Sequence, residues 1–365
     1  MALKSSCLIT QTSLKELLCT HTLGLVIIVM LMGCTADCCA VDNGTPPMGW
    51  EPWYTDHCGN SYKWDEEYYK KLADLFAASG LRDLGYKYLT IECGDHYRDK
   101  DGHILASPEK FPHGFNVITD YIHKKGLKVR DYTDAGEGKC CCFEGTGSRG
   151  HYEDDAQRWV NFGFDGIKID WCGGRTSGDL DYPEGSSTPR MGGDWKILMR
   201  NLDDDRHPDP KYVGPGKGWN YPDILLVGIP GGLNEIEERT QFSMWAIVAS
   251  PLFLGNDLFN MPQYAKEIVT NKEVMAIDQD PLGIQGDVVK EYENGKLQVW
   301  SKQLKNGSKA IGLLNRDTTS REIPSTGAIL RFPENGWSAI FGNMWTKASL
   351  TIGILLKSRR MGLRC

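Results

Sequence analysis

The chain has 365 residues, of which 41% are hydrophobic and 24% are charged. This is the composition of an ordinary globular protein, and the length allows one large and one small domain. The formal net charge is −7 and no basic tract is present, which argues against a nucleic-acid partner.

Residues 1–36 have the pattern of a signal peptide. Two lysines precede an apolar run over 23–32, and small residues follow it. The run has the length of a signal-peptide core and is too short to cross a bilayer. We therefore expect cleavage near Ala36 or Ala40 and a secreted protein, extracellular or lysosomal or vacuolar, with no membrane contact in its mature form. An uncleaved membrane anchor is the alternative.

The chain has twelve cysteines, which in a secreted protein suggest disulfides. A metal site is the alternative, but no Cys-x-x-Cys pair with matching histidine spacing is present, so we predict no metal. Asn43-Gly-Thr45 and Asn306-Gly-Ser308 match the N-glycosylation pattern, which also fits secretion.

Helical and strand patterns alternate from Thr45 to about Pro281. The first two predicted helices carry apolar residues on one face and end at a glycine. Such alternation implies a parallel sheet with helical crossovers, and over 45–281 it favours a (β/α)8 TIM barrel as the catalytic domain. The predicted helices are 65–79, 115–125 and 154–162, and the predicted strands are 86–91, 127–132 and 166–171.

The pattern changes after Pro281. Three strand-like runs, 288–292, 297–303 and 310–315, are separated by Asn-Gly turns typical of hairpins. We therefore predict an antiparallel β domain over 285–365. Its end is atypical, because the basic, turn-free tail after about Ser338 does not resemble final strands.

Polar residues follow the predicted barrel strands, where barrel enzymes build their active sites. Several are carboxylates, among them Glu92, Asp134, Asp170 and Asp223, and no serine or cysteine nucleophile has a partner motif. Paired carboxylates on a barrel suggest glycoside hydrolysis. The alternative is that these carboxylates bind a metal or cap helices.

Three motifs narrow this hypothesis: Thr45-Pro-Pro-Met-Gly-Trp50, Lys168-Ile-Asp170-Trp-Cys172 and Gly218-Trp-Asn-Tyr-Pro-Asp223. Together they resemble glycoside hydrolase family 27, the α-galactosidases and α-N-acetylgalactosaminidases. Trp245–Pro251 resembles the family's eighth strand. The resemblance implies a barrel followed by an antiparallel β domain, retention through a covalent glycosyl-enzyme, a terminal galactoside-type sugar as substrate and no cofactor. The resemblance does not fix the oligomeric state, and a homodimer is one of the alternatives.

The resemblance also assigns roles. Asp170 matches the nucleophile, and Lys168, two residues before it, points to the same side of a strand. Asp194 follows Arg190 by four residues and matches the acid/base, with Asp223 in reserve. The implied substrate contacts are Trp53, Glu92, Tyr132, Lys168, Arg190 and Asp223, and the implied disulfides are Cys58–Cys93 and Cys140–Cys172.

The second strand departs from the family. The family has two adjacent aspartates before a cysteine and a tryptophan, whereas this chain has Glu92-Cys93-Gly94, so the second position is either Cys93 or deleted. A glutamate reaches one methylene further and would crowd a hydroxymethyl group. A β-L-arabinopyranoside is therefore an alternative to galactose, and N-acetylgalactosamine also stays open.

A second departure is a gap. Only 17 residues, 173–189, lie between Cys172 and Arg190. They cannot hold helix 4, strand 5 and helix 5, because one crossover alone takes about 10–12 residues. Two interpretations follow: an active hydrolase, or an inactive truncated isoform or non-catalytic sugar-binding relative with an incomplete barrel.

Overall fold

The computed structural model describes residues 44–59, 61–138, 146–170, 194–317, 337–340 and 350–357. The predicted signal peptide lies outside them, as do Cys140, Cys172 and Arg190. Within the described part of the chain, no helix has the length and apolar character needed to cross a membrane.

A five-stranded sheet occupies the first part of the chain, and every pair of neighbours in it is parallel. Its order is β6-β5-β2-β1-β7, and a bridge from Leu225 to Leu254 extends it beyond β7. The first strand therefore lies between the second and the last parallel strands, as in a barrel. The strands are β1 (Met48–Trp50), β2 (Tyr88–Thr90), β5 (Lys128–Asp134), β6 (Gly166–Asp170) and β7 (Leu252–Leu254). The parallel part of the predicted barrel is confirmed, and its closure stays a prediction.

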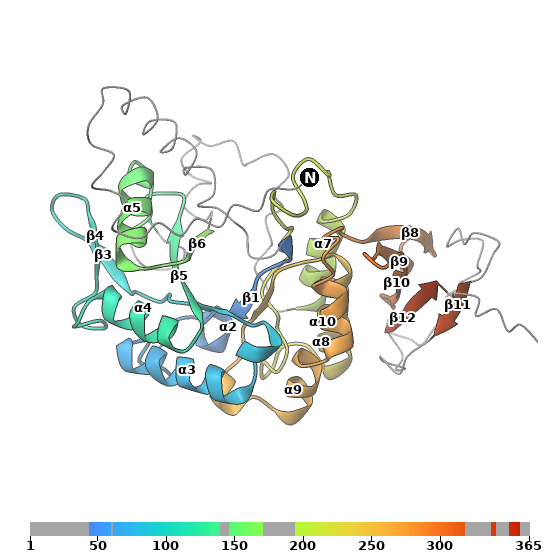
Figure 1. Ribbon diagram of the computed structural model, residues 1–365, viewed down its shortest axis with the longest axis horizontal. Helices are drawn as coiled ribbons and strands as arrows, with labels where there is room; N and C mark the ends of the chain where they lie inside the picture. Colours follow the sequence, from blue (N-terminus) through green and yellow to red (C-terminus); the bar gives the residue numbers. More distant parts are fainter. Residues whose placement is uncertain are drawn as a thin grey trace, which may run out of the picture. The chain divides into compact units, whose positions relative to one another are not determined.

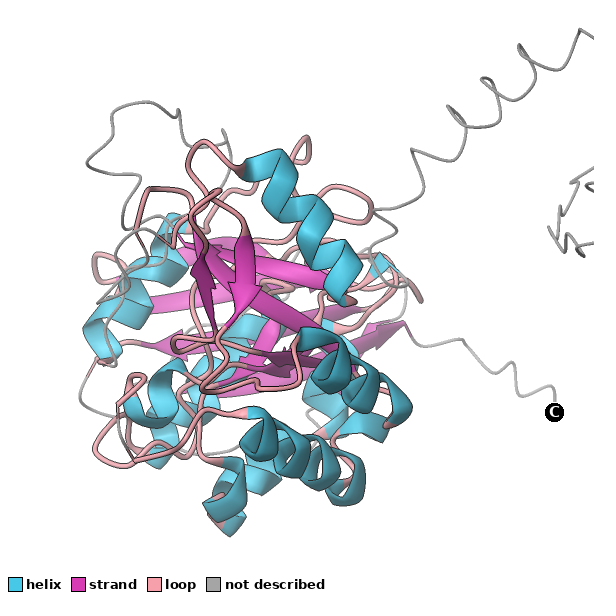
Figure 2. Cartoon of the chain, turned by 90° about the vertical axis from the view of Figure 1, so that its left-hand side faces the viewer, coloured by secondary structure: helices cyan, strands magenta, loops and turns pink. Residues whose placement is uncertain are grey.

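Helices flank this sheet (Figure 1, Figure 2). α3 (Glu66–Ser79) begins where the Asp65 side chain accepts from Tyr68 N, and it ends at Gly80, whose φ of 82° favours glycine. α3, α4 and α5 confirm the three predicted helices to within two residues at either end. The other elements of this part are α2 (Trp53–Asp56), α4 (Phe115–Lys124), α5 (Tyr152–Phe162), α7 (Trp195–Asp204), α8 (Glu235–Ile247), α9 (Gln263–Val269), α10 (Lys272–Asp278), the short helices Arg82–Leu84 and Leu258–Asn260, and the hairpin β3 (His96–Arg98) and β4 (Ile104–Ala106).

The prediction of a strand at Trp245–Pro251 is wrong. Its first three residues belong to the last turn of α8, and the strand β7 follows at Leu252. α8 begins at a capping box in which Asn234 and Glu237 bond each other's backbone. The helix is buried on nearly every side, so it has no polar face and its sequence lacks the amphipathic pattern that would reveal it.

The end of the chain forms a second, antiparallel sheet of order β11-β12-β10-β9-β8. Its strands are β8 (Asp287–Tyr292), β9 (Leu297–Gln303), β10 (Lys309–Asn315), β11 (Trp337–Ile340) and β12 (Leu350–Lys357). The expectation that the tail supplies no strands is wrong for 350–357, because β12 pairs with β10 along six residues. The aliphatic run Leu-Thr-Ile-Gly-Ile-Leu-Leu has enough strand propensity without flanking turn residues.

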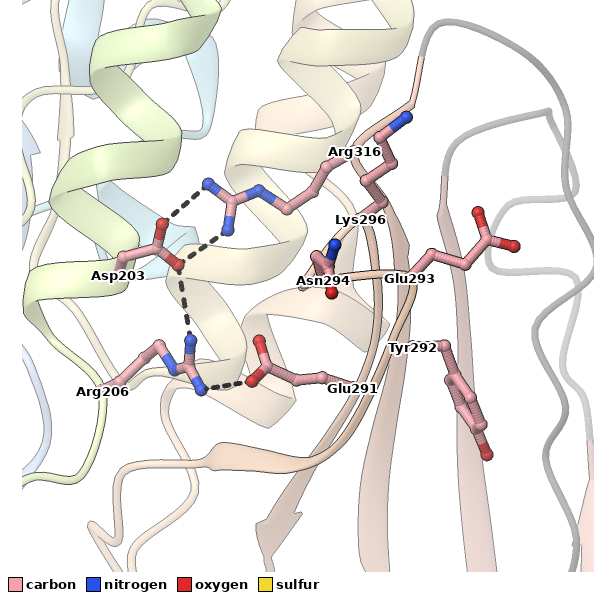
Figure 3. Close-up of a pocket in the computed structure, with 9 residues that line it drawn as sticks. Asp203, Arg206, Glu291, Tyr292, Glu293, Asn294, Lys296 and Arg316 are labelled. Carbon is pink, nitrogen blue, oxygen red and sulfur yellow. Dashed lines mark hydrogen bonds and ion pairs between the residues drawn. The ribbon is translucent and has the colours of Figure 1, made fainter.

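Ion pairs join α7 to the antiparallel sheet. The guanidinium of Arg316 donates to both carboxylate oxygens of Asp203, at 2.7 and 2.8 Å, and Arg206 donates to Glu291 at 3.0 Å (Figure 3). These residues line an open polar pocket of about 860 Å³. The contacts fix the C-terminal end of α7 against β8.

Candidate active site

The predicted site residues of the parallel sheet gather where its strands end. Glu92 lies two residues beyond β2, Tyr132 lies in the second half of β5, and Lys168 and Asp170 end β6. The pairing of β5 with β6 sets Tyr132 beside Lys168 and Asp134 beside Asp170. Because parallel strands end at the same edge, this edge carries the charged side chains.

Tyr132 contacts the predicted nucleophile directly. Its hydroxyl donates a hydrogen bond of 3.1 Å to Oδ2 of Asp170. Burial, and then the charge of Asp170, raise the pKa of Tyr132 well above its usual value. The hydroxyl therefore keeps its proton and stays a donor to the carboxylate.

Lys168 lies between two buried carboxylates. Its ammonium is 3.2 Å from Oε2 of Glu92 and 3.2 Å from Oε2 of Glu51. Burial alone would lower the pKa of Lys168, but Glu51, Glu92 and Asp170 together hold it well above its usual value. The ammonium is therefore charged at neutral pH, and it places a positive charge near Asp170.

Two charged residues of this cluster were not among the predicted site residues. Glu51, directly after β1, is fully buried and forms an ion pair with Arg130 of β5. Burial alone would raise the pKa of Glu51, but Lys168 and Arg130 hold it below its usual value. A glutamate is rarely fully buried unless it is paired, so the burial of Glu51 and its ion pair, which the folded structure brings together, identify it as part of the cluster.

Asp223 lies close to this cluster in a strained conformation. Its φ is +123°, which is rare for a residue with a side chain, and such strain concentrates at functional sites. Tyr54 donates to its Oδ2 at 3.1 Å and the amide of Ile224 donates to its Oδ1 at 2.7 Å. Burial raises the pKa of Asp223 to about 7. Its carboxyl group can therefore gain or lose a proton near neutrality.

Asp194 stands apart from the contacts just described. It is the N-cap of α7, and its Oδ1 accepts from Ile197 N at 2.9 Å in an exposed position. Its motif partner Arg190 and the segment back to Asp170 lie outside the described residues. Trp53 begins α2, half-buried, with its ring 5.3 Å from that of His57.

Cys58 and Cys93 form the disulfide that the resemblance implied. The bond ties the segment after α2 to the segment after β2, directly beside Glu92. Cys93 is thus the disulfide cysteine rather than a replacement for an aspartate. The chain therefore has one acidic residue at this strand end where the family pattern has two.

One cluster of the described residues has the side chains of a metal site. Asp95, His96 and Asp131 are buried, and their ligand atoms lie within 4.8 Å of one another. His96 Nδ1 is 2.7 Å from Asp95, and the indole of Trp159 donates to Asp131 at 2.6 Å. Burial, and then the charge of Asp95, raise the pKa of Asp131 to about 7. Hydrogen bonds account for this arrangement, which links the start of β3 to β5.

Comparison with known proteins identifies the family. Residues 45–186 and 195–280 match the family model of α-galactosidase A, and residues 294–359 match that of the α-galactosidase C-terminal β-sandwich domain. An α-galactosidase of rice, Oryza sativa subsp. japonica, is 36% identical over 323 residues, which cover 78% of this chain and 75% of the relative. α-Galactosidase A of Cellvibrio japonicus is 35% identical over 319 residues, covering 74% of this chain and 76% of the relative.

The fold agrees with these matches. The α-galactosidase of Saccharomyces cerevisiae, solved with raffinose, superposes with a TM-score of 0.64 at 25% identity, covering 82% of each chain. Both the parallel part and the antiparallel sheet thus have counterparts in proteins of one family. This chain belongs to glycoside hydrolase family 27, the α-galactosidase family of O-glycosyl hydrolases.

Proposed function

We propose that this protein releases terminal α-galactose from glycoconjugates or oligosaccharides with retention of configuration, through a covalent glycosyl-enzyme on Asp170. The observation that carries the proposal is the set of contacts around Asp170. Tyr132 donates to its carboxylate, and the charged Lys168 lies on the same strand. The hydrogen bond orients the carboxylate, and the ammonium places a positive charge near it, as a carboxylate nucleophile requires.

The reaction then has two steps. In the first, the Asp170 carboxylate attacks the anomeric carbon while the acid/base protonates the leaving oxygen, giving the glycosyl ester and a free alcohol. In the second, water attacks the same carbon, gives a proton to the acid/base and releases Asp170 as a carboxylate. Retention needs the two carboxyl groups about 5 Å apart.

The sequence motif supports Asp194 as the acid/base, because Asp194 follows Arg190 by four residues. One observation favours Asp223 as the second candidate: burial raises its pKa to about 7, the range that suits a group that both gives and takes a proton. Trp53, Glu92, Lys168 and Arg190 would contact the sugar.

A mechanism-based 2-deoxy-2-fluorogalactoside tests the nucleophile. It should label a single peptide, the one that contains Asp170, and Asp170→Asn should hydrolyse nothing while retaining its fold. Label on a peptide containing Asp194 or Asp223 would overturn the assignment.

Leaving groups separate the two acid/base candidates. Asp194→Asn should slow phenyl and alkyl galactosides strongly and dinitrophenyl galactoside little, because only poor leaving groups need a proton. The same selective loss in Asp223→Asn, with Asp194→Asn unaffected, would transfer the role to Asp223.

We also propose that the protein is secreted, on the strength of the leader pattern over 1–36. Expression of the full chain in a eukaryotic host and N-terminal sequencing of the medium should find a start near residue 37 or 41. Retention of the whole protein in the membrane fraction would favour the anchor instead.

A further inference from the structure

We infer that Glu51 is a positioning residue of this active site: it is the second carboxylate that holds Lys168, in place of the acidic residue that the chain lacks after β2. The inference deepens the proposed function and rests on it for the role of Lys168. The family motifs assign no role to Glu51.

The first argument is the burial and pairing of Glu51. The residue is 0% exposed, so its charge costs several kcal/mol unless it is paired. Three donors from three different segments meet it: Arg130 of β5, Lys168 of β6 at 3.2 Å, and the Tyr221 hydroxyl at 3.4 Å. Such a carboxylate can fix the positions of its partners relative to one another.

The second argument is the missing acidic residue. Cys93 forms the disulfide with Cys58, so Glu92 is the one acidic residue directly before this cysteine, where the family pattern has two. β1 is the direct neighbour of β2, and Glu51 follows β1 as Glu92 follows β2. A second carboxylate therefore reaches Lys168 from the adjacent strand rather than from the adjacent residue.

The third argument concerns direction. An ammonium group has three donors in tetrahedral arrangement. The Lys168 nitrogen is 3.2 and 3.4 Å from the two carboxylate oxygens of Glu92 and 3.2 Å from Oε2 of Glu51. The ammonium is therefore held by two carboxylates that follow two neighbouring strands. Glu51 has no exposed surface and cannot contact a sugar itself, whereas the Lys168 side chain is 19% exposed. Glu51 therefore acts through Lys168.

The test measures the reactivity of Lys168 itself. Competitive labelling of the folded full chain with trace acetic anhydride, read by mass spectrometry, reports how much of each lysine is free amine at a given pH. Glu51→Gln removes one of the charges that keep Lys168 protonated. A pKa of Lys168 lowered by one unit gives about tenfold faster labelling, and we expect an increase of that order.

The matched control is Glu66→Gln. Glu66 is also buried and forms an ion pair with a lysine, Lys70, but it lies on α3. This control should leave the labelling of Lys168 unchanged. For hydrolysis of nitrophenyl α-galactoside, Glu51→Gln should lower kcat about tenfold or more with a smaller change in KM, and Glu51→Asp should restore part of the loss.

Equal labelling of Lys168 in the parent and in Glu51→Gln would overturn the inference. If Glu51→Gln does not fold, Glu51→Asp takes its place, because its shorter side chain withdraws the carboxylate while keeping the charge. Unchanged labelling of Lys168 in Glu51→Asp would then be the contrary result. An inactive parent in which Lys168 labelling still depends on Glu51 would refute the proposed function and leave the positioning role standing.

Discussion

The hydroxyl of Tyr132 and the carboxylate of Asp170 are joined by a hydrogen bond of 3.1 Å between neighbouring parallel strands. The strand register, rather than a flexible loop, sets this distance. The donor and the charge it stabilises are therefore in place before a substrate arrives.

Tyr132→Phe removes that donor and keeps the ring. A hydrogen bond to a charged group contributes about 1.5–3 kcal/mol, so kcat/KM should fall roughly 10- to 150-fold. The circular dichroism spectrum and thermal midpoint should change little, because the ring still packs. Full activity in the variant would show that Asp170 does not depend on this bond.

Glu92→Asp tests substrate choice. Glu92 is held by Lys168 at the site edge, and its extra methylene should crowd the hydroxymethyl group of galactose. The substitution should raise kcat/KM for an α-galactoside relative to a β-L-arabinopyranoside by roughly 10- to 200-fold, the range for one small group in a pocket. A parent that prefers the galactoside and a variant with the same ratio would remove Glu92 from the specificity argument.

The sequence predicted the helices α3, α4 and α5 and the strands β5, β6 and β8 to β10, because each has a clear period and a stop signal. It placed Lys168 and Asp170 at a strand end for the same reason. It misplaced the strand near Trp245, because α8 is buried on nearly all sides and has no polar face. Glu51 could not be assigned, because its meaning depends on Arg130, Lys168 and Tyr221, which are far away in sequence.

Arg316→Met tests the link between α7 and the antiparallel sheet. The bidentate pair with Asp203 is half-buried, and its loss should lower the free energy of unfolding by about 1–3 kcal/mol. Lys296→Met is the control, since its pair with Asp317 is exposed at the lysine and should matter by less than about 1 kcal/mol. Urea unfolding compares the two. Equal effects would show that the Arg316 pair does not stabilise the fold.

Asp223 gives the stability a pH dependence. Burial raises its pKa to about 7 in the folded protein, against about 3.9 in an unfolded chain. Between pH 4 and 7 the folded state therefore holds a proton that the unfolded state has lost. The contribution of this group to stability is complete below pH 4 and is lost as the pH rises through 7, at up to about 1.4 kcal/mol per pH unit.

Asp223→Asn should remove that slope, because an amide does not titrate. Urea unfolding of parent and variant at several pH values between 4 and 8 measures the difference. Asp120→Asn, a change of an exposed carboxyl on α4, serves as the control and should follow the parent profile. A parallel profile in Asp223→Asn would mean that Asp223 is ionised throughout this range.

The last prediction concerns the 17 residues between Cys172 and Arg190. β6 is the edge strand of the described sheet, and the side chain of Ile169 within it is 64% exposed. An uncovered edge and an exposed apolar side chain favour aggregation.

A right-handed crossover to a further parallel strand needs a dozen or more residues, usually with a helix, so 17 residues cannot hold a complete strand 5 with helices on both sides. We expect the 365-residue chain to aggregate and to hydrolyse galactosides slowly. Insertion of the family's fifth-strand segment between Cys172 and Arg190 should cover Ile169, raise the yield of monodisperse protein and raise kcat/KM. A cooperative thermal transition and equal activity in the unextended chain would show that the shortened connection is tolerated.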